Sequence, residues 1–352
     1  MIYLELTNIL HLFSNKYKNI PIYCIKNENK VEVGLMALGA CVVFVRVPDR
    51  CGKVKNIALS LRNYRDYAEG GTYAGATVGP AAGRIRGGLL PVLGRVYTLP
   101  KNDGENTLHG GPDNLGHTVW RTADTFCNTS EAGVVFAQHL RDGRNGFPGE
   151  RDISVRYALS RDNTLTIQYT ATTDRTTWLN LTNHTYWNLT GDFSRPAYQQ
   201  ILQINADRVY YNDGAHLPVS CESTKGTPFD FTSPRPVADA LQSGPLHAQL
   251  RNASGYNNAY LLREDGKPAA VLSDPASGRR MTVSTDYPSL VFYSGGYLGG
   301  TGYTLDEQKI SASGAYALEA QFLPDAPHLL GSRAPFLRPG EVYRKTVSFC
   351  FS

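Results

Sequence analysis

Residues 153–171 read ISVRYALSRDNTLTIQYTA and contain the clearest structural signal in the chain. Apolar and polar residues alternate over residues 153–159 and again over residues 165–171. Such alternation predicts strands with one buried face, because successive side chains of a strand point to opposite faces. The polar residues 160–163 (SRDN) between the two runs are typical of a hairpin loop. The stretch therefore predicts an antiparallel β-hairpin.

Short runs of the same strand-like kind recur along the chain, at residues 42–47, 281–283, 290–293 and 342–349. Helical periodicity is scarce, and the 34 Gly, 20 Pro and 21 Tyr suit many short strands joined by turns. Hydrophobic residues make up 41% of the chain and supply ample material for a core. We predict an all-β fold built as a large antiparallel β-sandwich.

The 352 residues contain no low-complexity linker, charge block or repeat of fixed period. Large sandwiches often exceed the usual domain size as a single unit. We therefore predict one domain over residues 19–352. Residues 1–18 are expected to be an N-terminal extension with one or two helical turns.

Charge and hydropathy exclude several classes of partner. The net charge of +4 comes from Lys and Arg spread along the chain, whereas a nucleic-acid site needs a basic stripe. No run approaches the roughly 18 apolar residues of a membrane span. The N-terminus lacks the basic region of a signal peptide. We expect a cytoplasmic protein, monomeric or homodimeric, that binds neither nucleic acid nor membrane.

The cysteines and short motifs give no sign of a metal or cofactor. No CxxC pair is present, and HExxH, GxSxG, dinucleotide-binding and EF-hand motifs are all missing. Any chemistry is expected to need no metal and no cofactor. Six cysteines are expected to be free thiols packed as small hydrophobic groups: Cys24, Cys41, Cys51, Cys127, Cys221 and Cys350.

Residues 178–189 read WLNLTNHTYWNL and are unusually rich in polar and aromatic groups. If they form one strand, one face combines amide, hydroxyl, imidazole and aromatic groups: Trp178, Asn180, Thr182, His184, Tyr186 and Asn188. A saccharide needs such a face, with hydrogen bonds for its hydroxyls and an apolar plate for its C–H groups. The alternative is a solvated outer face with a histidine of no special role.

Residues 317–325 read ALEAQFLPD and place a carboxylate in an apolar strand. Alternation puts Leu318, Ala320 and Phe322 on one face and Glu319 and Gln321 on the other. Glu319 is then either a paired structural charge or a group whose pKa matters for function.

Two glycine-rich segments each carry one candidate side chain. Arg84 lies within residues 75–88 (GATVGPAAGRIRGG), which lack the spacing of a phosphate-binding loop, and His109 lies within residues 106–111 (NTLHGG). Taken singly, Arg84 suits a surface ion pair and His109 a turn that caps backbone groups.

Taken together, these segments resemble the aldose 1-epimerase (galactose mutarotase) family. The matching stretches keep the family's order over roughly residues 20–352, and the NHxYxNL and LExQxxPD patterns are the specific ones. The stretches are VPDRCGK (47–53), GATVGPAAGRIRGG (75–88), NTLHGG (106–111), NGFPG (145–149), ATTDRTTWLNLTNHTYWNL (171–189), GTPFDF (226–231), VFYSGGYL (291–298), LEAQFLPDAPH (318–328) and LRPGEVYR (337–344).

The resemblance implies the mutarotase-type supersandwich, with a free sugar bound in an open cleft on one sheet. It implies that Glu319 removes the proton of the C1 hydroxyl and that His184 protonates the ring oxygen. Arg84 and His109 would hold sugar hydroxyls or the ring oxygen. These roles require a protonated histidine beside an ionised glutamate, which their ordinary pKa values of about 6.5 and 4.3 allow near neutral pH. We therefore expect a bell-shaped pH profile.

The chain departs from the family pattern at four positions. Pro80 replaces an Arg, Gly83 an Asn, Asn257 an Asp and Val291 a Gln. These changes spare the acid and base but thin the shell that binds hydroxyls. Because Asn257 is uncharged, we hypothesise a preferred sugar other than galactose or glucose that carries an anionic substituent.

Two alternatives compete with an isomerase. A non-catalytic sugar-binding or sensing protein on the same scaffold would explain the altered hydroxyl shell, but binding alone does not need both Glu319 and His184. A glycoside hydrolase normally uses two carboxylates, and Asp325 resembles a turn residue after Pro324. An aldose 1-epimerase that interconverts α and β anomers is the function that the sequence favours.

Overall fold

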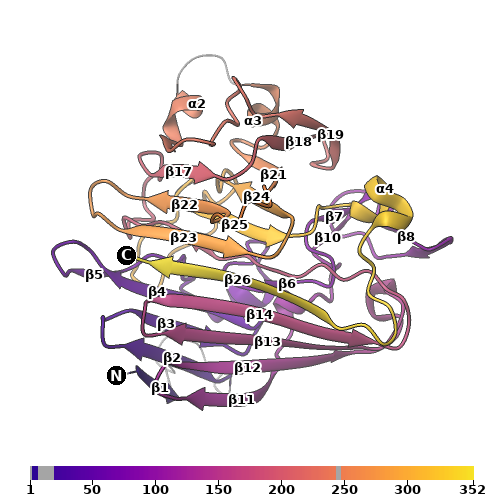
Figure 1. Ribbon diagram of the computed structural model, residues 1–352, viewed down its shortest axis with the longest axis horizontal. Coiled ribbons are helices and arrows are strands. Elements are labelled where there is room, and N and C mark those ends of the chain that lie inside the picture. The colour runs from indigo at the N-terminus through magenta and orange to yellow at the C-terminus, as the bar shows by residue number, and fades with distance from the viewer. Residues whose placement is uncertain (1, 7–19, 243–246) are drawn as a thin grey trace.

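The computed structural model describes residues 2–6, 20–242 and 247–352, and within them strands gather in three larger antiparallel sheets (Figure 1). The helices labelled in this view, α2 (Ala238–Gln242), α3 (Ala248–Asn252) and α4 (Ala326–Leu330), lie at its margins. The predicted all-β antiparallel fold is therefore confirmed. No helix in the described ranges is both long and apolar enough to span a membrane.

The first of these, here called the large sheet, contains the predicted hairpin. Strands β13 and β14 pair in register from Leu159 opposite Leu165 to Arg151 opposite Thr173. The strands of the large sheet, in spatial order, are β11 (Arg121–Cys127), β12 (Glu131–Leu140), β13 (Arg151–Ser160), β14 (Thr164–Thr173), β26 (Tyr343–Phe351), β23 (Arg280–Thr285), β22 (Ala270–Ser273), β17 (Ile201–Ile204) and β20 (Arg235–Pro236).

The second, here called the N-terminal sheet, is a meander in which each strand pairs with the next along the chain. Its strands are β1 (Ile2–Leu6), β2 (Ile22–Asn27), β3 (Glu32–Met36), β4 (Cys41–Pro48) and β5 (Val54–Asn56).

The third, here called the β25 sheet, brings together strands that are distant in sequence. In spatial order they are β16 (Tyr186–Trp187), β25 (Tyr316–Gln321), β24 (Ser289–Tyr293), β21 (Asn257–Leu261), β18 (Arg208–Asn212) and β19 (Pro218–Ser223).

Short strand pairs and helices complete the described part of the chain. The pairs are β6 (Thr77–Val78) with β15 (Thr182–Asn183), β7 (Arg84–Ile85) with β10 (Thr107–Leu108), and β8 (Leu89–Val92) with β9 (Arg95–Thr98). The helices are α1 (Tyr64–Glu69), α2 (Ala238–Gln242), α3 (Ala248–Asn252) and α4 (Ala326–Leu330), with 3-10 turns at Arg86–Gly88, Leu115–His117, Arg144–Gly146 and Gly331–Arg333.

The main hydrophobic core joins the three sheets. Alternate residues of β13, such as Val155 and Tyr157, pack in one buried cluster with Val33 of β3 and Leu318 of β25. Burying an aliphatic or aromatic side chain of this size contributes about 1.5–3 kcal/mol. Because β25 gives one face to this core, its other face is left to form a site.

The N-terminal segment differs from the expected helical turns. Residues 2–6 form β1, an edge strand paired with β2, and Ile2 is buried in the main core. An apolar strand of this kind gains ladder hydrogen bonds by joining the open edge of the sheet. Residues 7–18 of the predicted extension lie outside the described residues.

Each of the six cysteines, all within the described ranges, is a free thiol as predicted. Cys24 and Cys41 are buried, in keeping with packing as small hydrophobic groups. Cys51 and Cys127 are exposed, so burial does not extend to the whole set.

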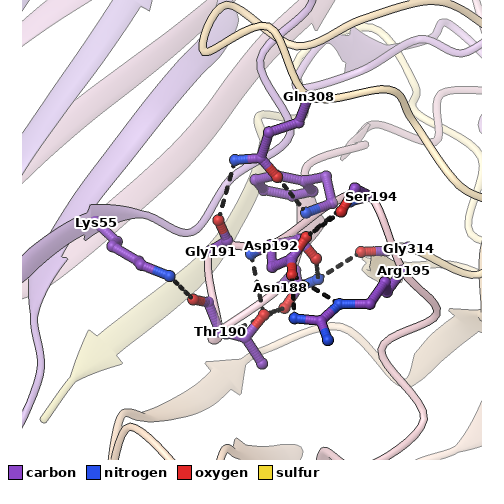
Figure 2. Close-up of polar contacts among 10 residues, drawn as sticks. Lys55, Asn188, Thr190, Gly191, Asp192, Ser194, Arg195, Gln308 and Gly314 are labelled. Carbon is purple, nitrogen blue, oxygen red and sulfur yellow. Dashed lines mark hydrogen bonds and ion pairs between the residues drawn. The ribbon is translucent and has the colours of Figure 1, made fainter.

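The turn that follows β16 is closed by the buried amide of Asn188 (Figure 2). Its Nδ2 donates to the carbonyl oxygens of Asp192, at 2.7 Å, and of Gly314, at 2.6 Å. Its Oδ1 accepts from the backbone N–H of Thr190 at 3.0 Å and from the hydroxyl of that residue at 2.7 Å. Gly314 lies two residues before β25, so one side chain connects β16 to the start of that strand.

Asn188→Ala is expected to lower the free energy of unfolding by about 2–4 kcal/mol, because the buried carbonyl oxygen of Gly314 and the partly buried one of Asp192 lose their donor. Urea denaturation measures the change. Asn128→Ala is the matched control: the Asn128 side chain also accepts two backbone hydrogen bonds, but at the surface. We expect that control to cost no more than about 1 kcal/mol. Equal losses in the two variants would contradict a special role for Asn188.

Candidate active site

A cleft of about 390 Å³ opens on the face of the β25 sheet that is turned away from the main core. All five candidate side chains from the sequence line it: Arg84, His109, His184, Asn257 and Glu319. They come from segments spread over most of the chain. The fold therefore brings together residues that the sequence shows only as separate motifs.

Glu319 reaches the cleft because of the alternation along β25. Leu318 and Ala320 enter the main core, whereas Glu319 and Gln321 line the cleft. Across the sheet, Glu319 stands opposite Val291 of β24, which in turn stands opposite Ala259 of β21. The faces predicted for residues 318–321 are confirmed.

The segment that carries His184 is more complex than the single strand expected. Residues 178–189 are buried throughout, and only two short strands, β15 and β16, form within them. His184 and Tyr186 line the cleft, whereas the polar side chains of Asn180, Thr182 and Asn188 do not. The prediction of one polar face for a saccharide was therefore wrong for those three residues.

Those three side chains instead bind the backbone in and beside β25. Asn180 Nδ2 donates to the carbonyl of Phe322 at 3.0 Å, and its Oδ1 accepts from the Phe322 N–H at 2.8 Å. The Thr182 hydroxyl donates to the carbonyl of Ala320 at 2.9 Å, and Asn188 binds Gly314 at the other end of the strand. The segment of His184 is thus joined to the strand of Glu319 near both ends of that strand.

The result is a buried pair of ionisable groups. His184 Nε2 lies 3.6 Å from Glu319 Oε1, and each side chain is only 6% exposed. The other ring nitrogen of His184, Nδ1, has no hydrogen-bond partner among the described residues. The pair can therefore exchange a proton with each other or with a molecule in the cleft.

Removal from water governs the charge of this pair. Burial raises the pKa of Glu319 from 4.5 to about 8, although the Arg84 guanidinium acts in the opposite direction. Burial lowers the pKa of His184 from 6.5 to about 4. Between these values Glu319 is protonated and His184 is neutral, because the interior disfavours both charged forms.

This state reverses the protonation expected from the ordinary pKa values, which put the proton on His184. The total is unchanged, since the pair holds one proton in either arrangement. Burial therefore changes where the proton resides in the free protein and widens the pH range over which the one-proton state exists.

Arg84 of β7 and His109, which directly follows β10, form a wall of the cleft. Arg84 Nε donates to Asp103 Oδ2 at 2.7 Å, and the arginine side chain is 17% exposed. The Gly83 N–H donates to His109 Nδ1 at 3.2 Å, which leaves the proton of a neutral imidazole on Nε2. Burial, with His184 and Arg84 adding to it, lowers the pKa of His109 well below 6.5.

Three of the four departures from the family pattern reach the cleft. Gly83, Asn257 and Val291 line it, whereas Pro80 does not and instead accepts a backbone hydrogen bond from Asn180. The Asn257 carbonyl accepts from Asn212 Nδ2 at 2.7 Å. Three of the four altered residues therefore change the lining of the cleft. Pro80 instead contributes a backbone hydrogen bond outside it.

Comparison with known proteins agrees with this geometry. The model of the family described as aldose 1-epimerase matches residues 21–350. The chain belongs to the aldose 1-epimerase family. Enzymes of this kind interconvert the α and β anomers of an aldose, so the chain is an isomerase.

Individual relatives support the assignment along the whole length. The aldose 1-epimerase of Escherichia coli (strain K12) is 34% identical over 333 residues, 93% of this chain and 94% of that one. The galactose mutarotase of Rattus norvegicus is 33% identical, with 92% of each chain covered. The crystal structure of a galactose 1-epimerase from Lactobacillus acidophilus NCFM has a TM-score of 0.85 at 29% identity and covers 100% of this chain and 98% of that one.

The cleft of this aldose 1-epimerase also contains aromatic residues that the sequence analysis did not select. Tyr73 stacks on His117 with ring centroids 4.8 Å apart and meets the His109 ring edge-on at the same distance. Tyr293 at the end of β24 and Tyr297 in the turn that follows also line the cleft. Their signal is weak in sequence, because these tyrosines lie beside glycine-rich turns and are few among 21.

The pKa shifts predict a pH dependence for a reaction that uses His184 and Glu319 as its base and acid. As pH falls through about 4, His184 takes a second proton and the pair loses its base. As pH rises through about 8, Glu319 loses its proton and the pair loses its acid. We expect kcat/KM to show a bell with limbs near these values, since kcat/KM reports the free enzyme.

Anomer interconversion should be followed by polarimetry from pH 3 to pH 10, with the uncatalysed rate subtracted at each pH. A limb near 6.5 in place of the one near 8 would show that burial does not determine which residue of the pair holds the proton. A flat profile between pH 5 and 9 would exclude the pair altogether.

Proposed function

We propose that Glu319 and His184 open and reclose the sugar ring as base and acid. The observation that carries this proposal is the pair itself: two buried groups 3.6 Å apart on the floor of a cleft. The reaction has no leaving group and no redox step, so one base and one acid meet its demands. Each such group typically contributes 10²–10⁴-fold to a rate.

In the reactive form the pair carries its single proton on His184. The Glu319 carboxylate takes the proton of the C1 hydroxyl, and the electrons of that O–H bond form the carbonyl of the open-chain aldehyde. The bond between C1 and the ring oxygen breaks, and His184 gives its proton to that oxygen. Rotation about C1–C2 followed by the reverse steps yields the other anomer.

Sugar binding supplies the reason for the proton to move. Hydroxyl groups that donate to Glu319 stabilise its ionised form, and Arg84 already favours that form. The proton then passes to His184 without any change in the total charge of the pair. Arg84 and the Nε2–H of His109 are placed to hold the sugar at the same wall.

The substrate that we propose is an aldose with an anionic substituent rather than galactose or glucose. In the described lining, Glu319 is the sole carboxylate, and this residue is neutral in the free protein near pH 7. Arg84, although ion-paired with Asp103, lines the cleft with its guanidinium, and the amide of Asn257 can donate a hydrogen bond without repelling an anion. These features favour an acidic sugar.

The proposed mechanism predicts that the wild-type protein accelerates anomer interconversion and that Glu319→Gln does not. Gln has nearly the same shape but cannot accept a proton at neutral pH. Freshly dissolved galactose, glucose, xylose and a hexuronic acid should be compared by NMR. Sugar binding without acceleration by the wild type would instead favour a non-catalytic binding protein.

The same panel tests the substrate class. In Asn257→Asp, we expect kcat/KM for the hexuronic acid to fall about tenfold relative to glucose, since an unfavourable charge contact of about 1.4 kcal/mol changes an equilibrium tenfold. The matched control is Asn128→Asp, which adds the same charge at an exposed position outside the cleft and should leave the ratio unchanged. An unchanged ratio in Asn257→Asp would remove the argument for an acidic sugar.

A further inference from the structure

Gln321 has the most unusual hydrogen-bonding state of the cleft residues. Its side chain lines the cleft, the residue is 1% exposed, and neither Oε1 nor Nε2 has a partner among the described residues. Leaving a buried polar group unpaired costs about 1–3 kcal/mol. Selection against such a cost implies a compensating contact with a molecule that enters the cleft.

The amide is not needed to hold the strand. The backbone of Gln321 pairs with Ser289 in the β24–β25 ladder, and the Ser289 hydroxyl donates to the Gln321 carbonyl at 2.6 Å. The neighbouring amide of Asn180 is by contrast used fully on the backbone of Phe322 and of Ala82. Gln321 therefore differs from the structural amides around it in having its side chain free.

Position and chemistry identify the partner. Gln321 follows Glu319 by two residues on the same face, which places its backbone about 6.6 Å further along the strand. This distance exceeds the separation of neighbouring hydroxyls on a pyranose, so the contact falls away from the anomeric hydroxyl. An amide both accepts and donates, and therefore complements two adjacent hydroxyl groups.

We propose that Gln321 is a substrate-binding and specificity-determining residue that hydrogen-bonds a pair of ring hydroxyls away from C1. The proposal deepens the proposed function and rests on it for the identity of the ligand as a sugar. It also implies that the amide lowers the stability of the free protein and is retained for binding, a common conflict between stability and function.

The test is Gln321→Met, which keeps the length of the side chain and removes both polar atoms. We expect unfolding in urea to require the same or a higher denaturant concentration than in the wild type. We expect the dissociation constant of the best sugar of the panel, measured by calorimetry, to rise about 10- to 100-fold, the loss of one or two hydrogen bonds to a ligand. The two limbs of the pH profile should stay in place.

Monodeoxy analogues identify the hydroxyls. For the wild type, removing a hydroxyl that Gln321 binds should weaken affinity, and for Gln321→Met the same removal should have little effect. A variant that discriminates every deoxy sugar as the wild type does would overturn the proposal. A variant that loses stability and keeps its affinity would show that the amide is structural.

Gln200→Met is the matched control. Gln200 is fully buried, its Nε2 also has no partner, but its Oε1 accepts from the Leu189 N–H at 2.8 Å and it does not line the cleft. We expect this variant to lose stability and keep sugar affinity. Affinity is measured directly, so the test of Gln321 does not depend on the acid–base mechanism. A wild type that binds sugar without turnover would refute the acid–base roles. The measured affinities would still decide whether Gln321 binds the sugar.

Discussion

Three buried side chains fix the distance between His184 and Glu319 on which the proposed chemistry of this epimerase depends. Asn180, Thr182 and Asn188 bind backbone groups of Phe322, Ala320 and Gly314, which lie 142, 138 and 126 residues further along the chain. These hydrogen bonds hold the segment of His184 against β25 near both ends of the strand. Side chains fixed in this way lose little freedom when a sugar binds, so the proposed acid and base need no rearrangement to act together.

The same contacts keep water away from His184 and Glu319, and this burial determines which of the two residues holds the proton. A histidine and a glutamate in water would form a charged pair near neutral pH, whereas burial favours the neutral form of each group. Both arrangements hold one proton, so in the proposed mechanism a neutral pair becomes a charged pair when substrate hydroxyls bind. The large sheet and the N-terminal sheet supply this environment because they leave one face of β25 for the cleft while burying the other.

Local alternation accounts for the part of the structure that the sequence could predict. The hairpin at residues 153–171, and the opposite faces of Leu318 and Glu319, follow from the period of a strand and are confirmed. The family resemblance supplied the candidate site residues, including Arg84 and His109. Without it, Arg84 suits a surface ion pair and His109 suits a turn. The glycine-rich motifs that carry Arg84 and His109 indicate no function when each is taken alone. They indicate a sugar site only because they occur in the order that the family shows.

The failures share a physical cause, which is that alternation shows the face of a side chain but not what that face meets. Asn180 and Thr182 were expected to face a sugar, but they meet the backbone of a strand more than a hundred residues away. The state of His184 and Glu319 could not be predicted for the same reason, since the segments that bury them are remote in sequence. Residues 2–6 pair with β2 through backbone groups that no residue type reveals.

Infrared spectroscopy of Glu319 tests most directly whether burial places the proton of the pair on this carboxyl. The difference spectrum between the wild type and Glu319→Gln should be recorded without sugar from pH 4 to pH 9. We predict the band of a protonated carboxyl at pH 6, replaced by carboxylate bands as pH rises through about 8. Carboxylate bands already present at pH 6, with the protonated form appearing only near pH 4.5, would contradict the account.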